Sequence, residues 1–189
     1  MIDGQRFPRD KACGDGLTPR AIAELELLGL GPWLGGRVRH RGLRMSGFGA
    51  DVEIEWPGPS FPPTSSAVPR TELDERIRQV AVDDGAQMLL GVKAVGVEHD
   101  STGRATSVTL EDGTAVGCRE LIVADGVRST LGRVLGREWH KETVYGVAIR
   151  GYVASPRTNE PWITSHLELR SPAGEVLPGH GWIFPLGDG

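Results

Sequence analysis

The amino-acid sequence predicts a mixed fold with α/β and α+β character, and three observations support this prediction. Two stretches, 19–28 and the one that follows Thr71, space their apolar residues as helices do. Short strand-like segments between 88 and 117 include the hairpin signal Asp112-Gly113. The run "ELIVAD" is continuously apolar, which is typical of a strand buried on both faces of a parallel sheet.

The first predicted helix spans residues 19–28. Thr18 is a good N-cap, Pro19 suits the first helical position, and Gly29 ends the run. The predicted apolar face consists of Ile22, Leu25 and Leu28. The following segment "RVRHRGLRMSGFGADVEIEW" alternates as strands do, and "PGPSFPPTSS" is a Pro/Ser-rich connection. We interpret this segment as an excursion away from the first layer.

The second predicted helix has Thr71 as its N-cap, Asp74 three residues later and Gly85 at its exit. Its apolar face consists of Leu73, Ile77, Val80 and Ala81. Strands are predicted at 88–90 and 92–98, followed by a turn at "DSTG" and by the hairpin in "ATSVTLEDGTAVGCRE". Beyond Leu135 the pattern is β again in "VYGVAIRGYV", "WITSHLEL" and "GWIFPL", so we predict a second, β-rich region from about residue 138.

Charge and cysteine content exclude several classes of protein. The 189 residues include 21 Lys and Arg against 25 Asp and Glu, a net charge of −4, which disfavours a nucleic-acid partner. Cys13 and Cys118 lack metal-ligand spacing, and the histidines show no metal or triad pattern, so we predict no metal site and no disulfide. No apolar run approaches the ~18 residues of a membrane span. We therefore expect a soluble protein of the reducing cytosol, at most peripheral to a membrane.

The motif G-x-G-x-x-G after a strand, which would indicate a dinucleotide site, is absent. The stretch "KACGDG" instead leads into a helix N-terminus, whose free N–H groups favour an anion or an electron-rich ring edge. Gly14 and Gly16 would let a ligand approach the backbone closely, and Cys13 beside Lys11 is a candidate reactive or cofactor-facing thiol. The alternative is an ordinary Gly-rich turn with an inert cysteine.

Three further groups of residues are candidate ligand-binding residues, and each also has a purely structural explanation. Asp125-Gly126 could meet a ribose hydroxyl or a phosphate-bound water, or could form an ordinary turn. Arg70 could reach a phosphate or pair with a neighbouring carboxylate, Glu72 or Asp74. Alternate spacing puts three aromatic residues on one strand face, which suits core packing or a groove for an apolar ligand; they are His180, Trp182 and Phe184.

Four segments, in their order along the chain, resemble those of a known protein family. "FPRDKACGDGLTPRAIAEL", "VPRTELDERIRQVAVDDGA", "LIVADGVRSTLGR" and "PGHGWIFP" together resemble the geranylgeranyl reductase family, which includes menaquinone side-chain reductases. This family is a branch of the para-hydroxybenzoate-hydroxylase-like flavoproteins. The resemblance covers essentially the whole chain, and "KACGDGLTPRA" is its most specific part.

The resemblance implies a partial FAD-binding Rossmann-like domain, residues 1–34 and 70–137, interleaved with a β-rich substrate domain, residues 35–69 and 138–189. The residues beside the isoalloxazine ring would be Cys13, Gly14, Asp15 and Gly16. Arg70 would touch the ribityl or pyrophosphate portion, and Asp125 and Gly126 would lie near the pyrophosphate. The implied substrate motif is His180, Trp182, Phe184 and Pro185, with His180 where the family usually has tyrosine.

The implied activity is FAD-dependent saturation of isoprenoid double bonds in a polyprenyl lipid, with NAD(P)H or another reductant as electron donor. The resemblance identifies no catalytic acid and no oligomeric state, and it implies a cytoplasmic protein with peripheral contact at the inner membrane face. Family members begin with a strand and G-x-G-x-x-G, so we expect an internal fragment. The alternatives are a catalytically inactive fragment or lipid-binding module, and an FAD-dependent aromatic monooxygenase.

Overall fold

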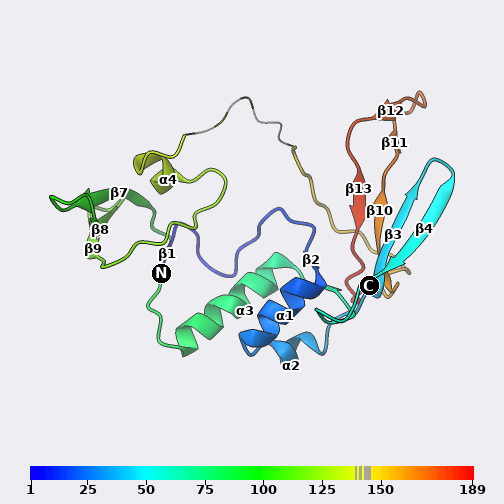
Figure 1. The fold of residues 1–189 in the computed structure, drawn as a ribbon, viewed down its shortest axis with the longest axis horizontal. Helices are drawn as coiled ribbons and strands as arrows, with labels where there is room; N and C mark the ends of the chain where they lie inside the picture. Colours follow the sequence, from blue (N-terminus) through cyan, green and yellow to red (C-terminus); the bar gives the residue numbers. More distant parts are fainter. Residues whose placement is uncertain (139, 141, 143–145) are drawn as a thin grey trace. The chain divides into compact units, whose positions relative to one another are not determined.

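The computed structural model describes residues 1–138, 140, 142 and 146–189 (Figure 1). The chain divides into two compact units. Unit 1 comprises Met1–Arg9 and Asp74–Val147, and unit 2 comprises Asp10–Leu73 and Ala148–Gly189. Unit 2 thus combines the "KACGDG" loop with residues 35–69 and 148–189, which are most of what the sequence predicts for the β-rich substrate domain.

Helix α1 (Pro19–Leu27) forms as the sequence predicts. The Thr18 hydroxyl accepts a hydrogen bond from the Ala21 N–H at 3.3 Å, and Gly29 ends the helix with a φ of +76°. Ile22 and Leu25 are buried, but Leu28 follows the last helical residue and is 48% exposed, so its assignment to the buried face was wrong. A short helix that the sequence analysis missed, α2 (Gly31–Leu34), comes directly afterwards.

Helix α3 (Arg70–Asp83) begins earlier than predicted. The Pro69 carbonyl accepts the Leu73 N–H at 3.0 Å, so Arg70 is already helical and Thr71 lies inside the first turn. Thr71 as the N-cap was therefore wrong, because the helix starts directly after a proline whose carbonyl supplies the first acceptor. Gly85, with a φ of +92°, ends the helix as predicted.

Unit 1 contains the predicted antiparallel sheet of β7 (Ala94–His99), β8 (Ala105–Leu110) and β9 (Ala115–Gly117). The turn at Asp112-Gly113 joins β8 to β9, with the Gly113 N–H bonded to the Leu110 carbonyl at 3.0 Å. Two further strands, β1 (Ile2–Asp3) and β6 (Leu89–Leu90), pair in parallel. The core of this unit is formed by Val108, Leu110 and, from α4 (Thr130–Val134), Leu131.

The predicted buried strand in "ELIVAD" does not form, because residues 120–125 have no strand partner among the described residues. Leu121 and Val123 pack against the core of unit 1, whereas Ile122 is 89% exposed. Alternate apolar side chains of the segment pack on one side, but a strand also requires a neighbour that supplies hydrogen bonds. The prediction of a parallel strand buried on both faces was wrong.

Unit 2 contains a four-stranded sheet in the order β13-β10-β3-β4. Its strands are β3 (Gly42–Gly47), β4 (Ala50–Glu55), β10 (Trp162–His166) and β13 (Gly181–Ile183). Strands β3 and β10 are parallel, whereas β4 and β13 run antiparallel to their neighbours. Figure 1 shows β3 and β4 as one long hairpin. Phe48 and Gly49, which connect these strands, both have positive φ, as the favoured two-residue hairpin turn requires.

Two smaller pairs complete the strands of unit 2. Strand β2 (Gly16–Leu17) pairs with β5 (Ser66–Ala67), and β11 (Leu169–Arg170) pairs with β12 (Val176–Leu177). Strands β10 and β11 confirm the β character predicted for "WITSHLEL", and β13 confirms that of "GWIFPL".

The predicted strand in "VYGVAIRGYV" was wrong for its described part, residues 146–153, which contain no strand; residues 144 and 145 lie outside the described residues. Val147, Ile149 and Val153 are 84–95% exposed, so the alternating apolar side chains face solvent. The intervening Arg150 and Tyr152 make polar contacts instead, as described below.

In the described residues, no helix combines the length and the apolar character needed to cross a bilayer.

Candidate functional site

The Cys13–Gly16 loop lies against the aromatic ring of Phe184. A Cβ atom at Gly14 would lie 2.5 Å from Phe184 Cε2, and one at Gly16 would lie 2.4 Å from Cε1. Both distances are far below van der Waals contact, so only glycine fits at these positions while the ring stays in place. The structure thus brings together two predicted segments that are far apart in the sequence.

Phe184 belongs to a series of aromatic contacts along the last strand. Trp182 stacks on Phe184 with ring centroids 5.9 Å apart, and His180 meets Trp182 edge-on at 5.6 Å. These contacts confirm that the three alternate residues share one face. Trp182 remains 44% exposed, so the series continues from the half-buried Phe184 to the surface.

Pro185, the fourth residue of the predicted substrate motif, is held by a buried histidine. The Pro185 carbonyl accepts a hydrogen bond from His40 Nε2 at 3.0 Å, and His40 is fully buried. Because a carbonyl can only accept, Nε2 carries the proton of the neutral ring. Burial lowers the pKa of His40, and the hydrogen bond to Pro185 opposes this only in part. The sequence analysis did not single out His40.

Asp15 is buried and makes polar contacts with residues far along the chain. Its φ of +61° lies in the left-handed region, which is uncommon for any residue with a side chain. Asp15 Oδ2 accepts a hydrogen bond from the Tyr152 hydroxyl at 2.6 Å and lies 3.3 Å from Arg150 Nη1. Asp15 Oδ1 is buried and accepts no hydrogen bond from the described residues.

Arg150 also binds the other carboxylate of this region, because its Nη2 lies 2.6 Å from both oxygens of Asp10. The hydrogen bond from Arg150 lowers the pKa of Asp10. Burial, together with the hydrogen bond to Asp15, raises the pKa of Tyr152 to about 12. Asp10, Arg150 and Tyr152 were missed by the sequence analysis. The sequence signal for Arg150 and Tyr152 was that these two polar residues stand at alternate positions in the otherwise apolar run "VYGVAIRGYV".

Two other predicted site residues of unit 2, Cys13 and Arg70, lie in different elements. Cys13 is half-buried and forms no disulfide. Arg70 is the first residue of α3 and is half-buried. Its two acidic neighbours form ion pairs, Glu72 with Arg37 at 2.6 Å and Asp74 with Arg9 at 3.3 Å.

Asp125 and Gly126 belong to unit 1, at the start of α4. Asp125 Oδ2 accepts the Leu131 N–H at 3.2 Å, and Gly126 has a φ of +86°. Partial desolvation would raise the pKa of Asp125, but hydrogen bonds from Ser129 and Leu131 outweigh it and leave the pKa lowered. In this structure the carboxylate therefore stabilises the first turn of α4. No cluster of three or more His, Cys, Asp or Glu that could hold a metal ion occurs among the residues described.

The loop carries polar atoms that a flavin could use. Gly14 and Gly16 present no side chains, but the ring of Phe184 covers them on the side that a Cβ atom would take. The half-buried Cys13 thiol and the buried free oxygen of Asp15 supply polar atoms in the same loop. These features fit the ring system of a flavin, whose polar edge requires hydrogen-bond partners.

Comparison with known proteins defines the class. The family described as "FAD binding domain" matches residues 8–181, and the chain belongs to this family. The chain is 75% identical, over all 189 residues, to the menaquinone reductase of Mycolicibacterium smegmatis. It is 70% identical over the same length to the menaquinone reductase of Mycobacterium tuberculosis. It spans 46% of the length of each of these relatives.

More distant similarities agree with this class. Digeranylgeranylglycerophospholipid reductase 1 of Methanopyrus kandleri is 27% identical over 94% of the chain, which covers 45% of that protein. Among solved structures, PqsL of Pseudomonas aeruginosa matches 98% of the chain and 50% of its own length with a TM-score of 0.72 at 18% identity. The myxobacterial halogenase CndH matches 99% of the chain and 44% of its own length, with a TM-score of 0.71 at 17% identity. These two structures show a shared fold and nothing about substrate.

Proposed function

We propose that the chain is part of an FAD-dependent reductase that saturates isoprenoid double bonds of a polyprenyl lipid, of the menaquinone type. The observation that carries the proposal is the 70–75% identity to menaquinone reductases over the whole chain. The contact between the "CGDG" loop and the aromatic strand supports it, because it joins the predicted cofactor loop to the predicted substrate motif.

In this proposal Cys13, Gly14, Asp15 and Gly16 lie beside the flavin ring. Arg70 contacts the ribityl or pyrophosphate portion, and Asp125 and Gly126 lie near the pyrophosphate. The assignment of residues 1–34 and 70–137 to the FAD-binding domain, and of 35–69 and 138–189 to the substrate domain, is part of the same proposal. When bound, FAD supplies the hydride, while the protein supplies orientation and excludes water.

The protein side of the reaction is carried by the aromatic series. Trp182 and His180 offer ring faces against which an isoprenoid chain can pack, and Trp182 is exposed enough to receive it. Phe184 stacks on Trp182 and lies against Gly14 and Gly16, so it connects this aromatic surface to the glycine loop. NAD(P)H is the first reductant to test, and the lipid substrate suggests peripheral contact with the inner membrane face.

The test begins with the visible absorption spectrum of the purified 189-residue chain expressed with ample FAD. Retention of flavin by this chain would support the proposal. Anaerobic incubation with NAD(P)H or dithionite and menaquinone should then add two hydrogen atoms per reduced double bond, as measured by mass spectrometry. Trp182→Leu should retain flavin and lose most turnover, whereas the exposed Val176→Leu is the control and should lose neither.

Two other results would contradict the proposal. Oxygen-dependent addition of an oxygen atom to an aromatic compound would identify a monooxygenase, a class that shares the fold. A folded chain that binds lipid without flavin would identify a lipid-binding module.

A further inference from the structure

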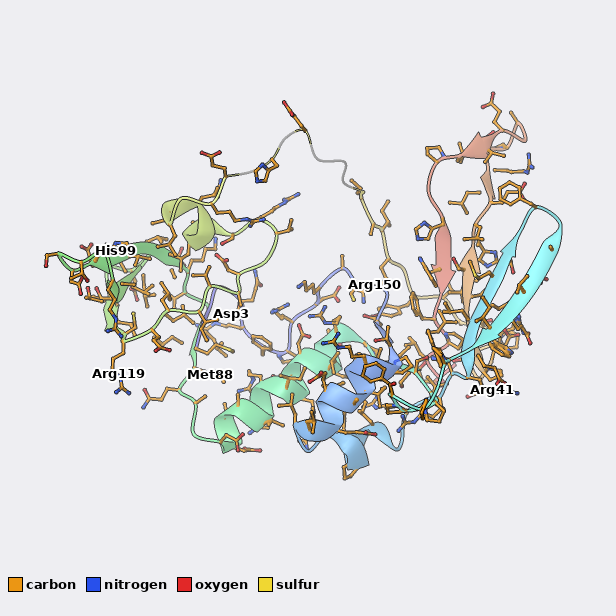
Figure 2. All side chains as sticks on the ribbon, viewed as in Figure 1. Asp3, Arg41, Met88, His99, Arg119 and Arg150 are labelled. Atoms are coloured by element: carbon orange, nitrogen blue, oxygen red, sulfur yellow. The ribbon has the colours of Figure 1, made fainter. Side chains whose placement is uncertain are left out.

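The Cys13–Gly16 loop is held from its polar side by a set of charged and hydroxyl groups, which we call the Arg150 cluster: Asp10, Asp15, Arg150 and Tyr152. Figure 2 labels Arg150, which lies 135 residues from Asp15 in the sequence. Neither the flavin assignments nor the aromatic series accounts for Arg150 or Tyr152. Among the residues that the structure describes, Arg150 and Tyr152 contact the loop through Asp15, and Arg150 also binds Asp10, three residues before the loop.

Asp15 is a costly residue at its position. Its side chain is 3% exposed, so the carboxylate has lost most of its hydration, and its backbone lies in the left-handed region. A glycine would relieve both costs. The side chain therefore depends on compensating contacts, which the Tyr152 hydroxyl and Arg150 supply.

Arg150 is suited to this task by its geometry. Arg150 Nη2 donates to both carboxylate oxygens of Asp10 at 2.6 Å, and the other terminal nitrogen, Nη1, lies 3.3 Å from Asp15 Oδ2. The guanidinium also lies over the Tyr152 ring, 4.4 Å from its centroid. A lysine at this position would keep the charge but could not serve both carboxylates in this way, because it lacks the planar fork.

We propose that Arg150 and Tyr152 are positioning residues that, through Asp15, hold the Cys13–Gly16 loop in the conformation that packs against Phe184. The cluster acts on the loop from its polar side, and Phe184 covers Gly14 and Gly16. The relevance of this role to catalysis rests on the proposed function, since the same loop is the proposed neighbour of the flavin.

The experiment measures how fast Cys13 reacts with a thiol reagent. All variants carry Cys118→Ala, so that Cys13 is the only cysteine. We expect Arg150→Met to raise the labelling rate constant about tenfold or more, as the loss of charge-assisted hydrogen bonds predicts when labelling requires loop opening. Arg150→Lys and Tyr152→Phe should give smaller increases, and both keep the proposal testable where Arg150→Met fails to fold.

Arg44→Met is the matched control. Arg44 also bridges two carboxylates of unit 2, Glu53 at 2.8 Å and Glu160 at 3.1 Å. The Arg44→Met substitution should leave the labelling rate constant of Cys13 unchanged. An equal increase in Arg44→Met and Arg150→Met would overturn the proposal, because general destabilisation would then explain it. An unchanged rate in Arg150→Met would overturn it as well.

The variant Asp15→Gly tests whether the side-chain contacts of Asp15 or the backbone conformation alone holds the loop. The proposal predicts faster labelling, whereas a loop held by backbone conformation alone would be labelled at the original rate or more slowly. Flavin absorbance is recorded in the same samples. Faster labelling with weaker flavin retention supports both proposals. The same labelling pattern without flavin in any sample, the unsubstituted chain included, supports the positioning role and contradicts the proposed function for this chain.

Discussion

At the scale of single residues, the two glycines of "CGDG" have a reason that the sequence analysis did not consider. The sequence analysis explains these glycines by the close approach of a ligand to the backbone. In the structure, the direction that a Cβ atom would take at either glycine is filled by the ring of Phe184. The protein's own aromatic residue is thus sufficient to require glycine here, and the flavin contact stays a proposal.

Gly16→Ala should destabilise the protein by about 1–3 kcal/mol, because the added methyl group would overlap Phe184. Urea denaturation followed by circular dichroism measures the change. The control is Gly36→Ala, since no heavy atom lies within 4 Å of a Cβ at Gly36. Combining Gly16→Ala with Phe184→Leu should recover part of the loss, and purely additive effects would argue against the contact.

His40 should make stability depend on pH in the range below its ordinary pKa of 6.5. Burial lowers its pKa in the folded state, so the unfolded chain binds the proton at higher pH than the folded chain does. Stability is then complete above about pH 6.5 and is lost progressively as the pH falls toward the folded-state pKa. Urea midpoints at pH 7.5 and 5.5 test this. His40→Gln should flatten the dependence, whereas the same slope in His40→Gln and in the parent would contradict it; exposed His99→Gln is the control.

At the scale of elements, the helices show how local signals succeed and fail. Thr18 is the cap of α1 as predicted, whereas Thr71 is not the cap of α3. Both residues satisfy the same preference for a hydroxyl before a helix. The difference is that Pro69 already provides the first acceptor for α3, which composition alone did not reveal.

Thr18→Ala should therefore cost about 1 kcal/mol of stability, because the Ala21 N–H loses its acceptor. Thr71→Ala should change stability by no more than about 0.5 kcal/mol. Thermal unfolding of the two variants compares them directly. A larger loss for Thr71→Ala than for Thr18→Ala would contradict the observed helix starts.

Two apolar segments were predicted as strands and have no strand partner among the described residues. Residues 120–125 show an apolar run, and the described part of "VYGVAIRGYV" shows alternation, both of which are genuine strand signals. A pattern of side chains reports which backbone conformation is favourable, but not whether a second strand is available to pair with it. Pairing is a tertiary property, so these errors could not be avoided from local sequence.

At the scale of the whole molecule, charge pairing should give a second pH dependence at lower pH. Hydrogen bonds lower the pKa of Asp10, Glu75, Glu160 and Glu168. Arginines supply them for the first three, and the Phe48 N–H is the main donor for Glu168. Their contribution is present above the ordinary carboxyl pKa values of 3.8 and 4.5 and is lost as the pH falls through the lowered values.

We therefore expect the urea concentration at the unfolding midpoint to fall between pH 5 and pH 3, in addition to the loss below about pH 6.5 that belongs to His40. Since Asp10 is exposed and the other three carboxylates are partly exposed, the loss should be smaller in 0.5 M NaCl, which screens surface pairs. A midpoint that stays constant from pH 5 to pH 3 at low salt would show that these pairs do not contribute to stability.

By itself, the sequence determined the features that depend on neighbouring residues. It predicted α1, the end of α3 at Gly85, the β7–β9 sheet and its Asp112-Gly113 turn, and its ordered motifs indicated the flavoprotein family that the whole-chain comparison supports. Only the tertiary structure decided which strands find partners, that Phe184 lies on Gly14 and Gly16, and that Arg150 and Tyr152 reach Asp15. The physical reason is range: caps and turns form within a few residues, whereas these contacts join segments that only folding brings together.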